Sequence, residues 1–196
     1  MTNEGLMPPT LLVVYAETSG RGPRRNLQKK SDAGRPPQLA TARITAENIN
    51  DLVATRGFAG DIDLLCLDLD GNDYWIWKAL TVVRPRVVVL EFSGGCGPDV
   101  AAAMSYKPDY QLDYNVAPYH CGASLAAFVK PGRATGYRLV GMQRLGFNAF
   151  FIREGVGTHL LPELTPAQLY APRGPVDWNA EARAIMSGGI EPRERV

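Results

Sequence analysis

The hydrophobic positions of the chain fall into short runs, which polar, glycine-rich and proline-rich stretches separate. Three runs are almost continuously apolar: TLLVVYAE (10–17), DIDLLCLDLD (61–70) and RVVVLEFS (86–93). Apolar runs of this length are typical of strands that are buried on both faces of a parallel sheet. Two later runs, YRLVGMQ (137–143) and NAFFIRE (148–154), are joined by RLGF and predict an antiparallel pair of strands.

Segments with helical spacing of their apolar residues lie between the predicted strands. ITAENINDLVATRGF (44–58) is amphipathic, and DYWIWKAL (73–80) directly follows an apolar run. GASLAAFVKPGRATGY (122–137) predicts a third helix, which ends before Pro131 or Gly132. This order of elements predicts an α/β fold with helices on both faces of the sheet, in which one of the last two strands runs antiparallel.

At 196 residues, the chain is long enough for one domain with a single core. We expect the α/β domain to span residues 1–154, and a proline-rich C-terminal tail with a short helix to span 155–196. Residues 18–40 are rich in Gly, Pro, Arg and Lys, which predicts a long mobile basic loop. This loop has six basic residues between Arg21 and Arg35 but no aromatic side chains among them, so we expect solvated charges and no nucleic-acid site.

The charge, the apolar runs and the cysteines of the chain limit the partners and the compartment that we expect for it. The formal net charge is +1, so the overall charge favours neither a nucleic acid nor a membrane surface. No apolar run approaches the roughly 20 residues that span a bilayer, and the N-terminus lacks the pattern of a signal peptide. The cysteines Cys66, Cys96 and Cys121 are widely spaced, which favours free thiols in a reducing compartment. We therefore expect a cytoplasmic protein.

The stretch LDLDGND concentrates polar side chains where the second apolar run ends. Asp68, Asp70, Asn72 and Asp73 lie in this turn, and Glu91 lies at the same end of the next apolar run. Ligands of open parallel sheets bind beyond the carboxyl ends of the strands. Carboxylates that meet there repel each other, so they favour a cation, a positively charged ligand or a shared proton. A helix cap by Asp70 or Asn72 accounts for only one or two of these groups.

Two acidic loops of known chemistry share part of this pattern. An EF-hand calcium loop needs glycine at its sixth position and glutamate at its twelfth, but with Asp68 as the first residue Gly71 is fourth and Ala79 is twelfth. A D-x-D-G turn after an apolar strand is also typical of haloacid-dehalogenase-type phosphatases, and Ser93 matches their second motif. The later part of this chain has no DD or GDxxxD pair to complete that site.

Three blocks of the chain form a longer ordered pattern within residues 44–154. They are DIDLLCLDLDGNDYWIWKAL, RPRVVVLEFS and GASLAAFVKPGRATGYRLVGMQRLGFNAFFIRE. Together they resemble the C-terminal half of FkbM-like S-adenosylmethionine-dependent methyltransferases. The resemblance implies a class I methyltransferase fold, with a mostly parallel Rossmann-like sheet and an antiparallel last strand. It also implies S-adenosylmethionine as cofactor and a small-molecule or sugar hydroxyl as methyl acceptor.

The N-terminal part of the chain departs from that family. Such enzymes open with an apolar strand and a Gly-rich turn that approaches the cofactor, whereas TSGRGPRR (18–25) carries proline and arginine. LLVVYAE instead resembles the family's second strand, whose terminal acid holds the ribose hydroxyls. On this mapping Glu17 would bind the ribose, and the first strand with its Gly-rich cofactor motif is missing or replaced.

The resemblance assigns candidate roles to several side chains. The implied cofactor contacts are Glu17, Asp68, Asn72, Asp73 and Glu91. Asp68 and Asp70 would face the methyl-donor pocket as catalytic groups, and His120 is a candidate general base beside them. The carboxylates could orient the acceptor hydroxyl, act as base, or hold a divalent ion that lowers its pKa, although no residue is assigned as a metal ligand.

Two functions follow from the sequence. The first is an S-adenosylmethionine-dependent O-methyltransferase that acts on a small-molecule substrate. The second is a truncated, non-catalytic protein of the same fold that serves as a binding or interaction module. The acidic turn favours the first function, and the missing Gly-rich turn favours the second.

Overall fold

The computed structural model describes residues 11–15, 42–112, 122–171 and 193–196. Several of the predictions above lie outside these residues and stay predictions. They concern Glu17, the basic loop 18–40, His120, Cys121 and the polar part of the tail before residue 193.

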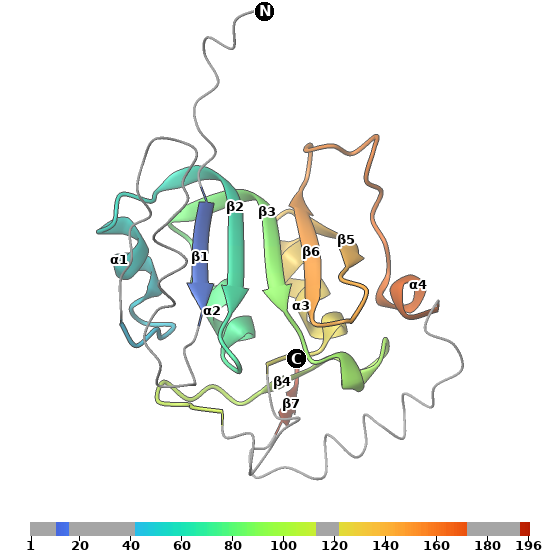
Figure 1. The fold of residues 1–196 in the computed structure, drawn as a ribbon, viewed down its shortest axis with the longest axis horizontal. Coiled ribbons are helices and arrows are strands. Elements are labelled where there is room, and N and C mark those ends of the chain that lie inside the picture. The colour runs from blue at the N-terminus through green and yellow to red at the C-terminus, as the bar shows by residue number, and fades with distance from the viewer. Residues whose placement is uncertain (1–10, 16–41, 113–121, 172–192) are drawn as a thin grey trace, which may run out of the picture.

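The core of the protein is a five-stranded sheet with the strand order β1-β2-β3-β6-β5 (Figure 1). Its strands are β1 (Leu11–Tyr15), β2 (Gly60–Asp68), β3 (Val83–Glu91), β5 (Tyr137–Met142) and β6 (Asn148–Arg153). β1, β2 and β3 are parallel to one another, whereas β6 is antiparallel to both of its neighbours, β3 and β5. The predicted strands and the predicted antiparallel pair are confirmed, and the fold is α/β with a mixed sheet.

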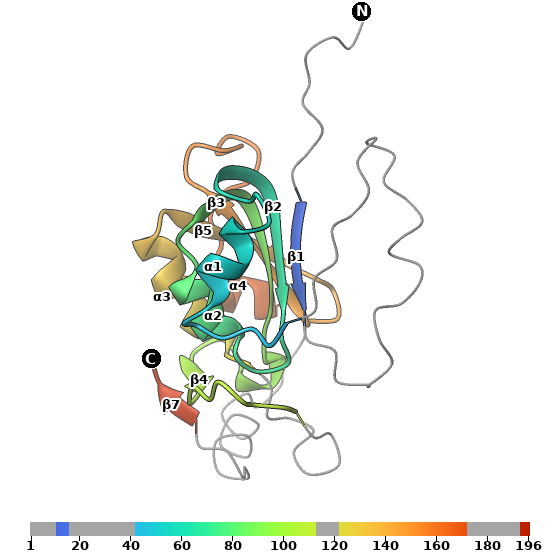
Figure 2. The same cartoon turned by 90° about the vertical axis from the view of Figure 1, so that its left-hand side faces the viewer.

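Three helices cover one face of this sheet: α1 (Ile49–Ala54), α2 (Asp73–Ala79) and α3 (Leu125–Ala134). Figure 2 shows all three on the same side of the strands. The prediction of helices on both faces is therefore wrong for the part of the chain that the structure describes. Strand residues that point toward the helices, such as Leu65 and Leu90, are fully buried. Their neighbours that point the other way, such as Cys66 and Val89, stay partly exposed.

Helix α3 continues through both residues that were expected to end it. The Ser124 hydroxyl caps its first turn by accepting a hydrogen bond from the Ala127 N–H, and the helix runs past Pro131 and Gly132 to Ala134. A Cβ atom at residue 132 would lie 3.0 Å from Trp77 and 3.2 Å from Phe151, so the glycine lets α3 approach the aromatic core closely. Packing on the sheet thus overrides the weak helix propensities of these two residues.

The position of β1 differs from the one that the family resemblance implied. β1 pairs directly with β2, in parallel, with Leu12 beside Leu65 and Val14 beside Leu67. In a doubly wound sheet of order 3-2-1-4-5-6, the first strand separates the second strand from the fourth. If β2 is the fourth strand, β1 occupies the position of the first. The assignment of β1 as a second strand, with the first strand missing, does not fit this pairing.

A second, small sheet lies beyond the lower edge of the main one in Figure 1. It consists of β4 (Ala102–Met104) and β7 (Arg193–Arg195), which are antiparallel. The indole N–H of Trp75 on α2 donates to the Met104 carbonyl oxygen at 2.7 Å and ties β4 to the core. β4 could not be predicted from the sequence, because three small or flexible apolar residues show no period.

The described part of the tail packs against the domain through α4 (Pro166–Tyr170). Thr165 and Gln168 form a capping box at its start. The Leu164 N–H donates to the Leu139 carbonyl oxygen on β5, and the Tyr170 hydroxyl donates to the Gly94 carbonyl oxygen at 2.8 Å. Because Tyr170 is buried, residues 164–170 belong to the folded domain.

Candidate active site at the carboxyl edge of the sheet

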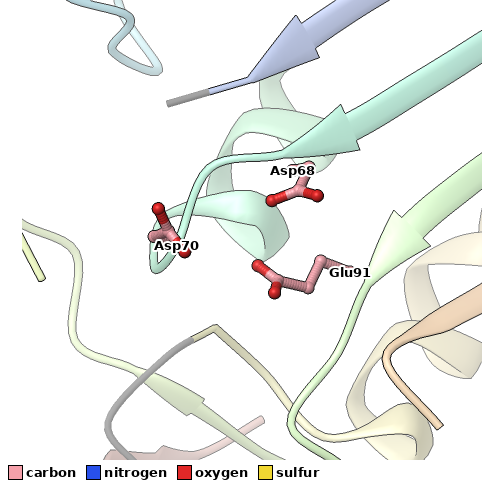
Figure 3. Close-up of side chains that lie close together, drawn as sticks. All are labelled: Asp68, Asp70 and Glu91. Carbon is pink, nitrogen blue, oxygen red and sulfur yellow. The ribbon is translucent and has the colours of Figure 1, made fainter. Parts of the chain in front are cut away.

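Three carboxyl groups converge where β2 and β3 end. Asp68 is the last residue of β2, Glu91 is the last residue of β3, and Asp70 lies in the turn that follows β2. One carboxylate oxygen of each lies within 4.8 Å of the others, and all three side chains are partly buried. Figure 3 shows that they point toward one another. The structure therefore brings together three of the residues that the sequence selected.

The strand register explains why Asp68 and Glu91 meet. Leu67 on β2 pairs with Leu90 on β3, so the next residues, Asp68 and Glu91, lie side by side and point to the same face. Asp70 reaches the same space because its backbone takes the left-handed conformation, with φ of 54°. Aspartate tolerates this conformation better than most residues.

Burial and mutual repulsion change the acidity of this pair. Burial, together with the charge of Asp68, raises the pKa of Glu91 to about 8. Burial also raises the pKa of Asp68, although a hydrogen bond from Glu91 opposes this increase. At neutral pH, Glu91 therefore holds a proton that it donates to the Asp68 carboxylate. The Glu91 Oε2 atom is buried and has no hydrogen-bond partner, so a ligand with a positive charge or a donor group would fit beside it.

Asp73 stabilises the acidic turn from within. Its side chain is fully buried and accepts hydrogen bonds from the backbone N–H groups of Leu69, at 2.8 Å, and Gly71, at 3.2 Å. Burial nevertheless raises its pKa to about 7. Both of its oxygens are thus used to shape the loop that carries Asp70. The geometry gives Asp73 a positioning role, whereas the sequence suggested a cofactor contact.

Asn72 does not form the helix cap that the sequence suggested for it, and its neighbour Gly71 has a steric role. Asn72 occupies the N-cap position of α2, but its side chain makes no capping bond and instead donates to the Lys107 carbonyl oxygen at 2.8 Å. A Cβ atom at residue 71 would lie 2.5 Å from the ring of Tyr110. Glycine is therefore required at this position by the close approach of Tyr110, while Asp70 takes the left-handed conformation of the turn.

Cys66 lies close to the acidic cluster on the same strand. Burial raises the pKa of its thiol, and the charges of Asp68 and Asp73 raise it further. A raised pKa keeps the thiol protonated at neutral pH and makes it a poor nucleophile. The candidate reactive groups of the site are therefore its carboxyl groups, and the Cys66 thiol is not one of them.

Two polar residues extend the site and were missed in the sequence. Asn148, at the start of β6, pairs with Glu91 in the antiparallel ladder. Gln143, just after β5, donates its backbone N–H to the Asn148 carbonyl oxygen at 2.7 Å. The oxygen of the Gln143 side chain is buried without a hydrogen-bond partner. The register between β3, β6 and β5, which places Asn148 beside Glu91 and Gln143 beside Asn148, was the only available signal.

Comparisons with protein-family models, with curated proteins and with solved structures gave no match for this chain. Among the described residues, no helix is both long and apolar enough to span a membrane.

Proposed function

We propose that the protein is an S-adenosylmethionine-dependent methyltransferase that acts on a hydroxyl group. The observation that carries this proposal is the convergence of Asp68, Asp70 and Glu91 at the carboxyl ends of two parallel strands. Open α/β sheets bind their ligands at this edge. The resemblance of residues 44–154 to FkbM-like methyltransferases supports the same proposal, and so does the position of β1 beside β2.

The charge of the cluster fits the proposed cofactor. S-adenosylmethionine carries a positively charged sulfonium, which makes its methyl group electrophilic. Asp68 is partly buried and hydrogen-bonded to a protonated Glu91, so the pair keeps a negative charge in surroundings of low dielectric constant. A sulfonium beside this pair would gain attraction that the neutral product, S-adenosylhomocysteine, lacks. The site would therefore hold the donor and favour release of the product.

The protein's own contribution would be positioning and proton transfer. The Asp68 carboxylate would accept the proton of the acceptor hydroxyl while the hydroxyl oxygen takes the methyl group, whose bond to the sulfonium sulfur breaks to leave S-adenosylhomocysteine. Glu91 would orient Asp68 by donating its hydrogen bond. Asp73 would keep the turn in shape through its bonds to Leu69 and Gly71.

A second candidate is a binding module that uses the same fold without catalysis. The stretch after β1, TSGRGPRR (18–25), has proline and arginine where the family has its Gly-rich turn. Such a module would bind a nucleoside or a protein partner but transfer no methyl group.

Isothermal titration of the full chain with S-adenosylmethionine and S-adenosylhomocysteine tests the proposal. We expect heat of binding for both ligands and a rise in the midpoint of thermal unfolding, because a ligand that binds the native state stabilises it. Parallel titrations in EDTA and in added Mg²⁺ will show whether a divalent ion at the same carboxylates changes the affinity. Absence of both heat and thermal shift at millimolar ligand would contradict the enzyme and favour the binding module.

A further inference from the structure

The segment that follows β4 is fixed to the helices near the carboxyl edge of the sheet. Residues 105–110 form this segment, and we call them the strap. β4 itself is tied to α2, since the Trp75 indole N–H donates to the Met104 carbonyl oxygen at 2.7 Å. The Tyr106 hydroxyl then accepts a hydrogen bond from the Ala46 N–H at 2.8 Å. These contacts hold the first half of the strap.

The second half of the strap lies on the acidic turn. The Lys107 carbonyl oxygen accepts two hydrogen bonds, from the Asn72 side chain at 2.8 Å and from the Tyr110 N–H at 3.1 Å. The second bond closes a tight turn that brings the Tyr110 ring against Gly71, where a Cβ atom would lie only 2.5 Å from the ring. The strap therefore contacts the two residues that directly follow Asp70.

Asp70 is the residue of the acidic turn whose backbone needs such support. Its φ of 54° is left-handed, a conformation that is unfavourable for a residue with a Cβ atom and persists when the surroundings hold it. Asp73 holds the turn from within, through its bonds to the N–H groups of Leu69 and Gly71. The strap holds the same turn from outside.

We infer that Tyr110 is a positioning residue of the candidate active site, and that it acts through Gly71 to hold the Asp70 carboxylate beside Asp68 and Glu91. Packing of the Tyr110 ring on Gly71 leaves the turn no room to relax away from the cluster. The inference rests on the proposed function, and it adds the strap to the parts of the chain that keep a carboxylate beside the methyl donor.

The titration of Glu91 reports the place of Asp70. Burial raises the pKa of Glu91 to about 8, and three neighbouring charges raise it further, those of Asp68, Asp73 and Asp70. Water screens a carboxylate that moves out of the cluster, so a displaced Asp70 would raise this pKa less. A loss of global stability alone leaves the pKa of the folded protein unchanged.

The test is a carbon-13 NMR titration of the Glu91 carboxyl group in the full chain. We expect Tyr110→Ala to lower the Glu91 titration midpoint by about half a pH unit or more. Asp70→Asn should lower it too, and Tyr110→Ala should add nothing in the Asp70→Asn background, because the charge that it displaces is gone. A Glu91 midpoint that Tyr110→Ala leaves at the wild-type value overturns the inference.

Tyr106→Ala is the matched control, because it removes the same ring from the same strap but leaves the contact of Tyr110 with Gly71. This variant should lower the midpoint of thermal unfolding and keep the wild-type titration of Glu91. Equal changes of the Glu91 midpoint in the two variants would show a general loosening of the strap and overturn the role of Tyr110.

Gly71→Ala tests the same contact from the other side. The added methyl group must displace the Tyr110 ring, so we expect a lower Glu91 midpoint and a lower midpoint of thermal unfolding. In the Tyr110→Ala background the methyl group meets no ring, and Gly71→Ala should then change neither value. Full additivity of the two substitutions contradicts the proposed contact.

Titration of Tyr110→Ala with S-adenosylmethionine and S-adenosylhomocysteine separates this inference from the proposed function. We expect the preference for S-adenosylmethionine to fall toward that of Asp70→Asn. A Glu91 midpoint that depends on Tyr110, without binding of S-adenosylmethionine, supports the positioning role and contradicts the methyltransferase. Binding of S-adenosylmethionine with a Glu91 midpoint that Tyr110→Ala leaves unchanged overturns the positioning role and leaves the methyltransferase intact.

Discussion

Replacing Arg138 with methionine will lower the free energy of unfolding by about 3–5 kcal/mol, since three partly buried carbonyl oxygens lose a charged hydrogen-bond donor. Arg138 on β5 is only 3% exposed. Its guanidinium donates to the carbonyl oxygens of Leu161 at 3.2 Å, Arg153 at 3.1 Å and Val156 at 2.6 Å. It also lies 3.6 Å from the exposed carboxylate of Glu154. Methionine fills similar space but leaves these carbonyl groups without their donor.

Urea unfolding of wild type, Arg138→Met and Arg133→Met measures this effect. Arg133 pairs with Glu163 at 2.8 Å, but 58% of its side chain is exposed, so its replacement should cost less than about 1 kcal/mol. Equal losses for the two variants would show that the buried guanidinium does not hold the segment between Arg153 and Leu161 to β5.

Replacing Asp68 with asparagine will weaken binding of S-adenosylmethionine about 10- to 100-fold, the usual contribution of a hydrogen bond to a charged group. The change removes the charge of the acidic pair but keeps the size of the side chain. Burial raises the pKa of Asp68, so its charge costs stability in the native protein. The neutral amide should therefore leave the midpoint of thermal unfolding unchanged or higher.

Titration calorimetry on Asp68→Asn and Asp63→Asn separates this effect from a general change in charge. Asp63 lies on the same strand and forms a partly exposed ion pair with Arg86 at 3.7 Å, away from the carboxyl edge. We expect Asp63→Asn to bind like the wild type. An Asp68→Asn variant with wild-type affinity would mean that the methyl donor binds elsewhere.

The sequence predicted those strands that a pattern of neighbouring residues along the chain reveals. β2 and β3 are continuous apolar runs, and β5 and β6 flank a short turn, so their existence and order followed from pattern alone. The path of α3 through Pro131 could not be predicted, because it depends on the space that Gly132 leaves against Trp77 and Phe151. The apolar runs of the strands also could not show that the described helices cover only one face of the sheet. The reason is that partly exposed strand residues such as Cys66 and Val89 are as apolar as the buried ones.

The same distinction holds for the site. Asp68 and Glu91 were found because each ends an apolar run, and the ends of parallel strands meet at one edge. Asn148 and Gln143 were missed because their place depends on the register between β3, β6 and β5. The use of Asp73 inside the turn, with Asn72 turned toward Lys107, depends on side-chain geometry that spacing does not determine.

The ratio of the affinities for S-adenosylmethionine and S-adenosylhomocysteine, measured at about pH 7 and about pH 9, tests the central claim most directly. The two ligands share the α-amino group, so the ratio isolates the sulfonium charge. The pKa of Glu91 is raised to about 8, so Glu91 is mostly neutral at the lower pH and ionised at the higher pH. The second negative charge should attract the sulfonium more strongly.

We therefore expect the wild type to prefer S-adenosylmethionine at both pH values, and the preference to rise about threefold or more at the higher pH. Glu91→Gln should make this rise smaller and leave only the part that comes from Asp73, whose pKa of about 7 means that it also ionises further between the two pH values. A wild-type ratio that stays near one at both pH values would contradict the claim that this acidic edge holds a positively charged methyl donor.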